Sequence, residues 1–578
     1  MSQGFSKLIF SALMALLYPN DNVSSKIIYV YSNDDVVKVL AQQNVRYIIK
    51  DNLDLDGKIV QVGKGCKLDF RGGSFSNGTI IGDDTIIEAG NYEIFRRGYT
   101  RFRAYKTADI SKNAHPHLVK KHLNSIVVKG TWNNSYCKAN WTGLQNESSE
   151  DVMLALKNYV VLHKRNSDVV IPRINAFGYE STTIPKDYNI DFNGSIISYP
   201  DDLDIWLDDK AELPDGAIPC HLESGYGLIS LSDNTTISNL VLDGKSSCRA
   251  DEPVKFGVSC LIAIGNAKNV RFNNVSINNV LGPAVTAQQK SENIKFDNCH
   301  FYNIGEHIVY SHQYLGFCIF NNCTFDTWDS ERLSVARKGL NYLYKFNPPA
   351  VSDNISYQDI YKFVLEFNNC KINNPRRVNS EGRTLGGFIT STAPLTIKLN
   401  HCELTGVMPP FNPSGGSVPT ETLGMCNKLI VKDCLGAPSI YSSNHCYNII
   451  AEYYNCKKLD FSTIYSKVYD NCEIRIDSYN SSKENVSSSF DSEFLKPLFV
   501  SNCTFYDEGS DFVRHTVIHR PVVFKKCKFK ESVSRKKSVC FLDLRKAKNK
   551  EVILEDCEVE MNKVKFVLGG SIRVINNK

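Results

Sequence analysis

A short phrase built around an Asn-Cys pair recurs along the chain, and its interval restricts the fold more than any other feature. The phrase "FDNCHFYNI" at 296–304 returns as "FNNCTFDTW" at 320–328, which places the two cysteines 24 residues apart. One interval earlier, "FNNVSINN" carries Val275 in the position of the cysteine. Repeats of this length are typical of stacked units that cannot bury their apolar face alone.

The phrase continues towards the C-terminus at intervals that range from 16 to 47 residues. Its later cysteines are Cys370, Cys402, Cys434, Cys456, Cys472, Cys503, Cys527 and Cys557. Each copy alternates apolar and polar residues around an Asn or Asp, a pattern of short strands and turns with no competing helical period. The intervals leave no room for crossover helices. The sequence therefore predicts an all-β protein, a right-handed parallel β-helix with one cysteine of each turn in an inward column. The repeated Asn is expected at a turn, because it tolerates left-handed backbone.

Composition supports a folded chain and excludes some partners. Of 578 residues, 42% are hydrophobic and 22% charged, and the formal net charge of +5 is too small for this length to indicate nucleic-acid binding. The 19 cysteines are spread along the repeat and do not form the dense clusters of a disulfide framework. They are expected to be free thiols, which suits folding in a reducing cytosol. Neither a metal nor a cofactor is predicted.

The N-terminal segment contains an apolar run, Leu8–Tyr18, of eleven residues. Such a run is too short to span a bilayer, and only Lys7 precedes it as a basic residue. We expect residues 1–25 to form an attachment helix rather than a signal peptide, with no membrane insertion.

Four regions are expected along the chain. They are an attachment helix and adaptor at 1–50, a small β-solenoid coil set at 51–100, a linker at 101–148, and a parallel β-helix at 149–578 with a helical N-terminal cap. In that cap, Ser148 or Ser149 would begin a helix with Val152, Leu156, Tyr159 and Val160 on one face. Loops are predicted near 407–424 and 477–494, which are rich in Pro and Gly or in Ser.

The region before the repeats carries a resemblance to a known family. A Trp-Gly segment, the capping helix, "VVIP" at 169–172 and "TTISNLVLDG" at 235–244 resemble the entrance to pectate-lyase-superfamily β-helices. That group includes tailspikes and depolymerases of bacteriophages and secreted polysaccharide-degrading enzymes of gut bacteria. Residues 53–90 are also similar to N-terminal parts of such proteins from Bacteroidetes and their phages. The usual acidic and glycine motifs before the helix are replaced here by "LQNESSED", which implies altered loops.

The resemblance implies a phage tailspike or tail-fibre protein in the virion tail. Such a protein would bind host surface polysaccharide, contact other tail proteins through its N-terminal segment and form a homotrimer. One alternative is a secreted, extracellular polysaccharide lyase or glycoside hydrolase. A second alternative is a structural virion component without enzymatic activity.

Cleavage of a polysaccharide requires two carboxylates, or a base opposite a charge-neutralising group. The segments 301–312 and 325–332 contain the most candidate residues. They belong to neighbouring turns, so their side chains would come close together. The predicted catalytic residues are Glu306, Asp329 and Glu331, and the predicted substrate-binding residues are Asp243, His307, Asp326, Trp328 and Arg332. Trp328 would stack against a sugar ring. The alternative is that these acidic residues are ordinary solvated turn residues, and whether the chain cleaves a glycan or holds it stays open.

Overall fold

The computed structural model describes most of the repeats and the region that precedes them. The described residues are 26–105, 117–144, 152–178, 182–198, 228–245, 261–280, 282–288, 291–312, 315–328, 342–347, 356, 359–360, 362–373, 387–391, 395–405, 427–438, 449–461, 466–475, 497–506, 516–517, 521–531, 539–545, 551–560 and 564–576. The expected attachment helix at 1–25 and the loops near 407–424 and 477–494 lie outside these residues. The described residues form two compact units, one ending at Thr182 and the other beginning at Thr183.

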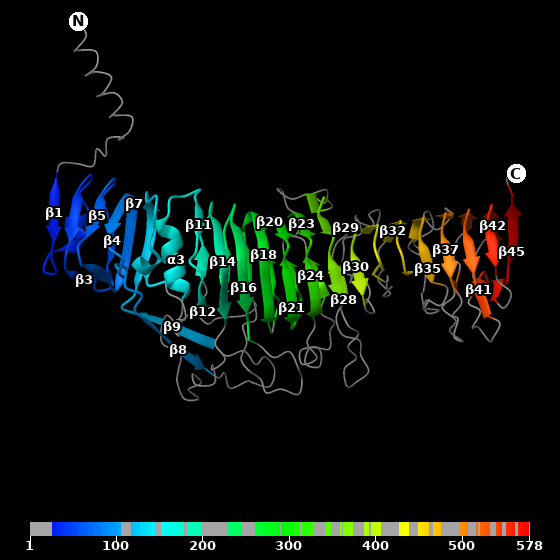
Figure 1. Cartoon of the computed structure of the whole chain (residues 1–578), viewed down its shortest axis with the longest axis horizontal. Helices are drawn as coiled ribbons and strands as arrows, with labels where there is room; N and C mark the ends of the chain where they lie inside the picture. Colours follow the sequence, from blue (N-terminus) through cyan, green and yellow to red (C-terminus); the bar gives the residue numbers. More distant parts are fainter. Residues whose placement is uncertain are drawn as a thin grey trace, which may run out of the picture. The chain divides into compact units, whose positions relative to one another are not determined.

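The first unit is a small parallel β-solenoid (Figure 1). Its strands are β1 (Ile27–Val30), β2 (Arg46–Ile49), β3 (Asn52–Asp54), β4 (Ile59–Gln61), β5 (Lys67–Phe70), β6 (Ser74–Ser76), β7 (Gly78–Ala89), β10 (Ile126–Trp132), β11 (Asp168–Val170) and β12 (Asn175–Phe177). β1, β2, β5 and β7 pair in parallel in that order, and β4 and β10 also pair with β7. A short helix, α2 (Val36–Leu40), separates β1 from β2. An antiparallel hairpin of β8 (Tyr99–Tyr105) and β9 (His117–Leu123) projects from the coils.

The capping helix is α3 (Met153–Leu162), and it is buried on almost every side. Val152, Leu156, Tyr159 and Val160 are all buried, as the sequence predicts. The polar Asn158 joins the helix to β10, because its Oδ1 accepts from the N–H of Val128 at 3.0 Å and its Nδ2 donates to Ile126 O at 2.8 Å. The predicted serine cap is wrong, since Val152 occupies the N-cap position and no side chain bonds there.

The second unit is the parallel β-helix that the repeated phrase predicts. Its long sheet stacks strand on strand in sequence order (Figure 1). The strands of this unit's long sheet are β14 (Asn189–Ser198), β16 (Thr236–Asp243), β18 (Lys268–Val280), β20 (Glu292–Asp297), β21 (His300–Ile304), β23 (Leu315–Asn321), β24 (Thr324–Trp328), β26 (Val364–Asn368), β27 (Lys371–Asn373), β29 (Thr396–Asn400), β30 (Glu403–Thr405), β31 (Asn427–Lys432), β32 (Ile449–Tyr454), β34 (Ser466–Asp470), β36 (Leu498–Ser501), β39 (Val522–Lys525), β42 (Glu551–Glu555) and β45 (Ser571–Ile575).

Three further sets of parallel strands complete the turns of this unit. The set called the short sheet below comprises β15 (Ile229–Leu231), β17 (Ile262–Gly265), β19 (Val285–Gln288), β22 (Val309–His312), β25 (Tyr342–Asn347) and β28 (Gly387–Ser391). Nearer the C-terminus lie β33 (Leu459–Asp460), β35 (Glu473–Arg475), β37 (Thr504–Tyr506), β40 (Lys528–Lys530) and β43 (Glu558–Glu560), and separately β38 (Thr516–Val517), β41 (Val539–Asp543) and β44 (Val564–Leu568). Because the strands of the long sheet stack in register, equivalent residues of the repeated phrase lie in one row along it. Phe296, for example, pairs with Phe272 on the preceding turn and with Phe320 on the next.

The repeated Asn and Cys take the places that the sequence predicts. Asn298 and Asn322 have φ of 56° and 52°, so they supply the left-handed turn between two strands. The cysteines that follow them point inward, and Cys299 and Cys323 are buried free thiols. The Sγ of Cys323 donates to Asn321 O at 3.3 Å and to Phe296 O of the preceding turn at 3.5 Å. The thiol column is thus part of the core, beside stacked phenylalanine rings.

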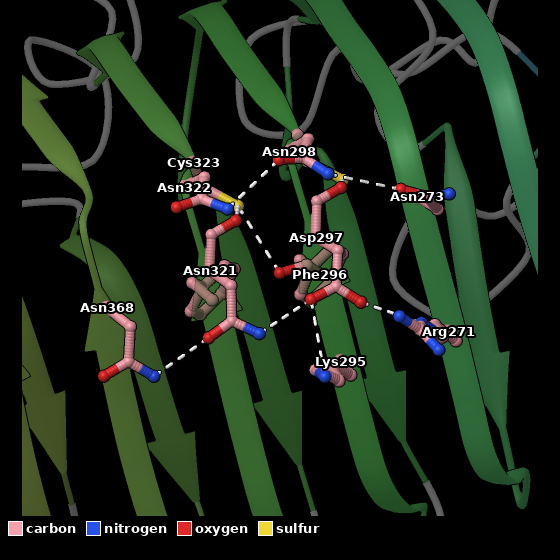
Figure 2. A network of polar contacts seen from close by, with 12 residues as sticks. Arg271, Asn273, Lys295, Phe296, Asp297, Asn298, Asn321, Asn322, Cys323 and Asn368 are labelled. Carbon is pink, nitrogen blue, oxygen red and sulfur yellow. Dashed lines mark hydrogen bonds and ion pairs between the residues drawn. The ribbon is translucent and has the colours of Figure 1, made fainter.

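Side-chain amides run along the outside of the same turns. Asn322 Nδ2 donates to Asn298 Oδ1 at 3.2 Å, and Asn321 Nδ2 donates to Asp297 Oδ1 at 2.7 Å. Asn368 continues the second row by donating to Asn321 Oδ1 at 2.9 Å. Figure 2 shows both rows, which link neighbouring turns of the β-helix in this region.

Candidate functional site

Glu306 and His307 lie in the segment that joins β21 to β22, at the edge of the short sheet. Their exposed fractions are only 8% and 7%, an uncommon degree of burial for ionisable side chains. Backbone hydrogen bonds fix the segment against the preceding turn: Glu306 N–H donates to Gly282 O at 3.3 Å, and Ala284 N–H donates to His307 O at 3.1 Å. Both candidates are therefore held by backbone rather than carried on a free loop.

The imidazole of His307 has a defined environment. The N–H of Tyr342 on the next turn is 2.9 Å from its Nδ1. The carbonyl oxygen of Tyr342 lies 3.2 Å from the same nitrogen, so the backbone of Tyr342 holds this edge of the ring. The His307 ring stacks on Tyr342, with centroids 6.3 Å apart and an interplanar angle of 21°. It also stacks on Tyr310, at 5.6 Å and 20°.

A cation completes this group of residues on the outer face of the short sheet. Lys345 pairs in register with Tyr310 on the neighbouring strand, and its Nζ lies 4.9 Å from the centroid of the Tyr310 ring. Both side chains are partly exposed, unlike the buried residues that flank them. We call Glu306, His307, Tyr310, Tyr342 and Lys345 the His307 cluster.

The His307 cluster combines groups that acid–base chemistry on a glycan requires. A carboxyl group, an imidazole, a phenol and an ammonium can each donate or accept a proton at a suitable pH. Tyr310, the partly exposed ring of the stack, adds an apolar face of the kind on which sugars pack.

Asp243 and Asp326 lie on the long sheet, in one outward-facing row. The register runs from Asp243 to Asn278, then to Tyr302 and to Asp326, so the two carboxylates are three turns apart on the same flank. Asp326 Oδ1 accepts from Thr327 Oγ1 at 3.0 Å and from Asn373 Nδ2 at 3.4 Å.

Asp243 likewise bonds a neighbour in its own turn and an Asn of the next turn. Its Oδ1 accepts from Asn279 Nδ2 at 2.9 Å and from the N–H of Lys245 at 3.0 Å. Lys245 Nζ lies 3.3 Å from Oδ2. These contacts agree with a turn-stabilising role for both carboxylates, and Tyr302 contributes an exposed aromatic ring between them, with 45% of its surface accessible.

Trp328 does not occupy the sugar-binding position that the sequence predicts. Its ring belongs to the core, with 1% of its surface exposed, and its Nε1 donates to Gly387 O at 2.9 Å. The side chain ends a strand and follows the inward row, because Trp328 pairs with the buried Ile304. A ring in this position is not available to stack against a sugar.

Asp329, Glu331 and Arg332 lie outside the described residues. The register explains why their relation to Glu306 does not follow from the repeat. Tyr302 pairs with Asp326, 24 residues later, whereas His307 bonds Tyr342, 35 residues later. Additional chain is therefore inserted between β24 and β25, directly where these three residues occur.

Tyr310, Tyr342 and Lys345 are site residues that the sequence reasoning missed. Tyr310 alternates with buried Val309, a signal that it faces outward. The other two residues follow the inserted segment, so the simple interval does not align them with His307.

The described part of the chain contains no group of three or more His, Cys, Asp or Glu side chains placed to hold a metal ion. Within those same residues, no helix combines the length and apolar character that a membrane span requires.

Comparison with known proteins identifies similar folds and no family. No protein-family model matches the sequence, and no curated protein is significantly similar to it. The surface adhesin PfbA of Streptococcus pneumoniae is similar over 74% of this chain and 92% of its own, with 10% sequence identity and a TM-score of 0.39.

Two further solved structures have comparable similarity. The family 28 exopolygalacturonase of Yersinia enterocolitica is 12% identical over 79% of this chain and 80% of its own, with a TM-score of 0.35. The tailspike protein gp49 from Pseudomonas phage LKA1 is 10% identical over 90% and 73%, with a TM-score of 0.27. At this level the likeness concerns the fold alone and carries no argument about ligand or reaction.

Proposed function

We propose that this chain is a bacteriophage tailspike or tail-fibre protein whose β-helix binds host surface polysaccharide and cleaves it at the His307 cluster. The observation that carries the proposal is a buried imidazole stacked between two tyrosines, with a lysine over one of them and a buried carboxyl residue next to it in the sequence. Glu306 and His307 would act as the acid and base, while Tyr310 and Lys345 would orient the sugar. Nδ1 of His307 is held by the backbone of Tyr342, which fixes the orientation of the imidazole in this cluster.

Additional contacts to the glycan are proposed around this cluster. Asp243 and Asp326 share a row with the exposed ring of Tyr302, so they would contact a chain that runs along the long sheet. Catalytic roles for Asp329 and Glu331 and a binding role for Arg332 stay part of the proposal.

The free thiols support assembly inside a host cell. The cysteines whose side chains are described are unpaired, and nearly all are buried in the core. Secreted proteins more often oxidise their cysteines to disulfides, so a virion protein folded in the cytoplasm fits these thiols better. Attachment through residues 1–25, other tail proteins as partners and a homotrimeric state belong to the same proposal.

The test is incubation of the full chain with purified capsular and surface polysaccharides from a panel of gut bacteria. Binding is measured by co-sedimentation, and cleavage by new reducing ends and by the ultraviolet absorbance of unsaturated sugars. We expect one polysaccharide to bind and to release oligosaccharides. Glu306→Gln and His307→Gln should reduce the rate by about 100-fold or more, the scale of a lost acid–base group.

Glu292→Gln is the matched control, because Glu292 lies on the outer face of the long sheet and pairs with Lys268 at 2.9 Å. It should leave the rate unchanged. Binding without any product would assign the chain to adhesion. Cleavage that survives both cluster variants would refute the site, and no binding to any polysaccharide would refute the function.

A further inference from the structure

The first unit contains a pocket that the proposed function does not use. Its volume is about 500 Å³, within the ~300–1,000 Å³ typical of small-molecule sites. The residues that line it are Asn91, Tyr136, Cys137, Lys138, Ala139, Asn140, Leu144, Tyr159, Pro172, Arg173 and Ile174. All belong to the first unit, so the pocket is separate from the His307 cluster.

The pocket has an apolar floor and a polar rim. Cys137, Leu144, Tyr159 and Ile174 are buried and form the floor. The rim contains Tyr136, which is 65% exposed. A flat aromatic ring at the mouth of such a pocket is suited to covering the apolar face of a sugar.

The charge of the rim is positive. Lys138 and Arg173 line the pocket, and none of its lining residues is acidic. Lys138 Nζ is anchored by donation to Ala89 O at 3.2 Å. Asn91 and Asn140 add neutral amides that can both donate and accept hydrogen bonds. Among these groups the exposed guanidinium of Arg173 is the one that can bind a carboxylate through charge-assisted hydrogen bonds.

The ionisable side chains in the floor of the pocket are not suited to catalysis at neutral pH. Burial raises the pKa of the Cys137 thiol to about 12, so it is protonated and a poor nucleophile at neutral pH. Burial likewise raises the pKa of Tyr159 to about 12, and its hydroxyl donates to Val170 O at 3.2 Å. Both groups are therefore neutral parts of a binding surface.

We infer that this pocket binds one acidic sugar residue of the uronic acid class, with the carboxylate at Arg173 and the ring against Tyr136. The inference is independent of the His307 cluster and does not require that the chain cleave a polysaccharide.

The experiment uses the full chain and galacturonate, glucuronate, galactose and inorganic phosphate as probes, with saturation-transfer NMR and calorimetric titration as readouts. We expect the two uronates to bind and their affinity to fall as salt is added. Galactose and phosphate should bind at least tenfold more weakly than the uronates, because galactose lacks the negative charge and phosphate lacks the sugar ring.

Arg173→Gln and Tyr136→Ser should each weaken the uronates about tenfold, the scale of a lost charge-assisted hydrogen bond or a lost stacking face. Arg165→Gln is the control, because Arg165 is an exposed arginine of the same unit outside the pocket. Unchanged melting temperatures establish that all variants fold. Affinity unaffected by Arg173→Gln, galactose binding as tightly as galacturonate, or no uronate binding would each overturn the inference.

Discussion

Asn321 donates a hydrogen bond from Nδ2 to Oδ1 of Asp297 at 2.7 Å, and so joins equivalent positions on successive turns of the β-helix. The bond is one member of a row, because Asn368 donates to Asn321 at 2.9 Å and Asn400 donates to Asn368 at 2.8 Å. An amide can donate to one neighbour and accept from the other, so each Asn serves two turns at once. Figure 2 shows how the row begins at the charged group of Asp297.

Substitution of Asn321 should therefore loosen three turns together. Asn321→Ala removes one donated and one accepted hydrogen bond, and we expect a local destabilisation of about 1–3 kcal/mol. Hydrogen exchange of the amides in β20, β23 and β26 measures it directly, since stacked repeats open locally. Asn373→Ala is the control, because its ladder bonds are longer, at 3.4 and 3.2 Å, and more exposed. Equal exchange rates in the two variants would contradict the role of the row.

Asp297 should make the folded β-helix less stable at acidic pH. Its burial opposes ionisation, but hydrogen bonds from Asn321 and Arg271 outweigh it and lower the pKa of the carboxyl in the folded state. The stabilisation is therefore complete above the pKa of the unfolded chain, and it is lost as the pH falls through the lower, folded value. Thermal unfolding followed from neutral pH into this acidic range should show the loss. Asp297→Asn should reduce that slope, and an unchanged slope would contradict the assignment.

The sequence predicts the stacked turns of the β-helix but only part of the candidate site. Asn298 and Cys299 repeat at fixed positions, and backbone geometry makes each copy repeat the same turn and the same inward side chain. Trp328 has the same spacing from Cys323 as Ile304 has from Cys299. The sequence repeat alone therefore predicts that Trp328 points inward, although its aromatic ring suggested a sugar-binding role. The contact between His307 and Tyr342 could not be predicted from the sequence, because an inserted segment lies between these two residues and breaks the regular interval.

Cys318 and Cys323 should be protected from alkylation until the chain unfolds. Burial raises the pKa of Cys318, and hydrogen bonds with the neighbouring thiols together with burial raise that of Cys323. A neutral, buried thiol reacts slowly with alkylating reagents. Among cysteines with described side chains, we expect Cys557 to react first, since it alone is partly exposed. Alkylation with peptide mapping by mass spectrometry checks the order, and labelling of Cys323 as fast as Cys557 in native protein would contradict it.

Gly387 should control the geometry of the His307 cluster. A Cβ at this position would lie 2.2 Å from Cδ1 and 2.3 Å from Cε1 of Tyr342, so Gly387→Ala must displace that buried ring. Because Tyr342 stacks on His307 and donates its N–H to Nδ1, the imidazole should shift or change tautomer.

We expect Gly387→Ala to cost about 1–3 kcal/mol of stability, as overpacked sites do, and to move the imidazole NMR signals of His307. Gly265→Ala is the matched control on the same sheet, because a Cβ there meets no atom within 4 Å. It should leave both stability and the His307 signals unchanged. If the imidazole signals stay fixed in Gly387→Ala while stability falls, Tyr342 fills space without orienting His307, and the cluster loses its positioning residue.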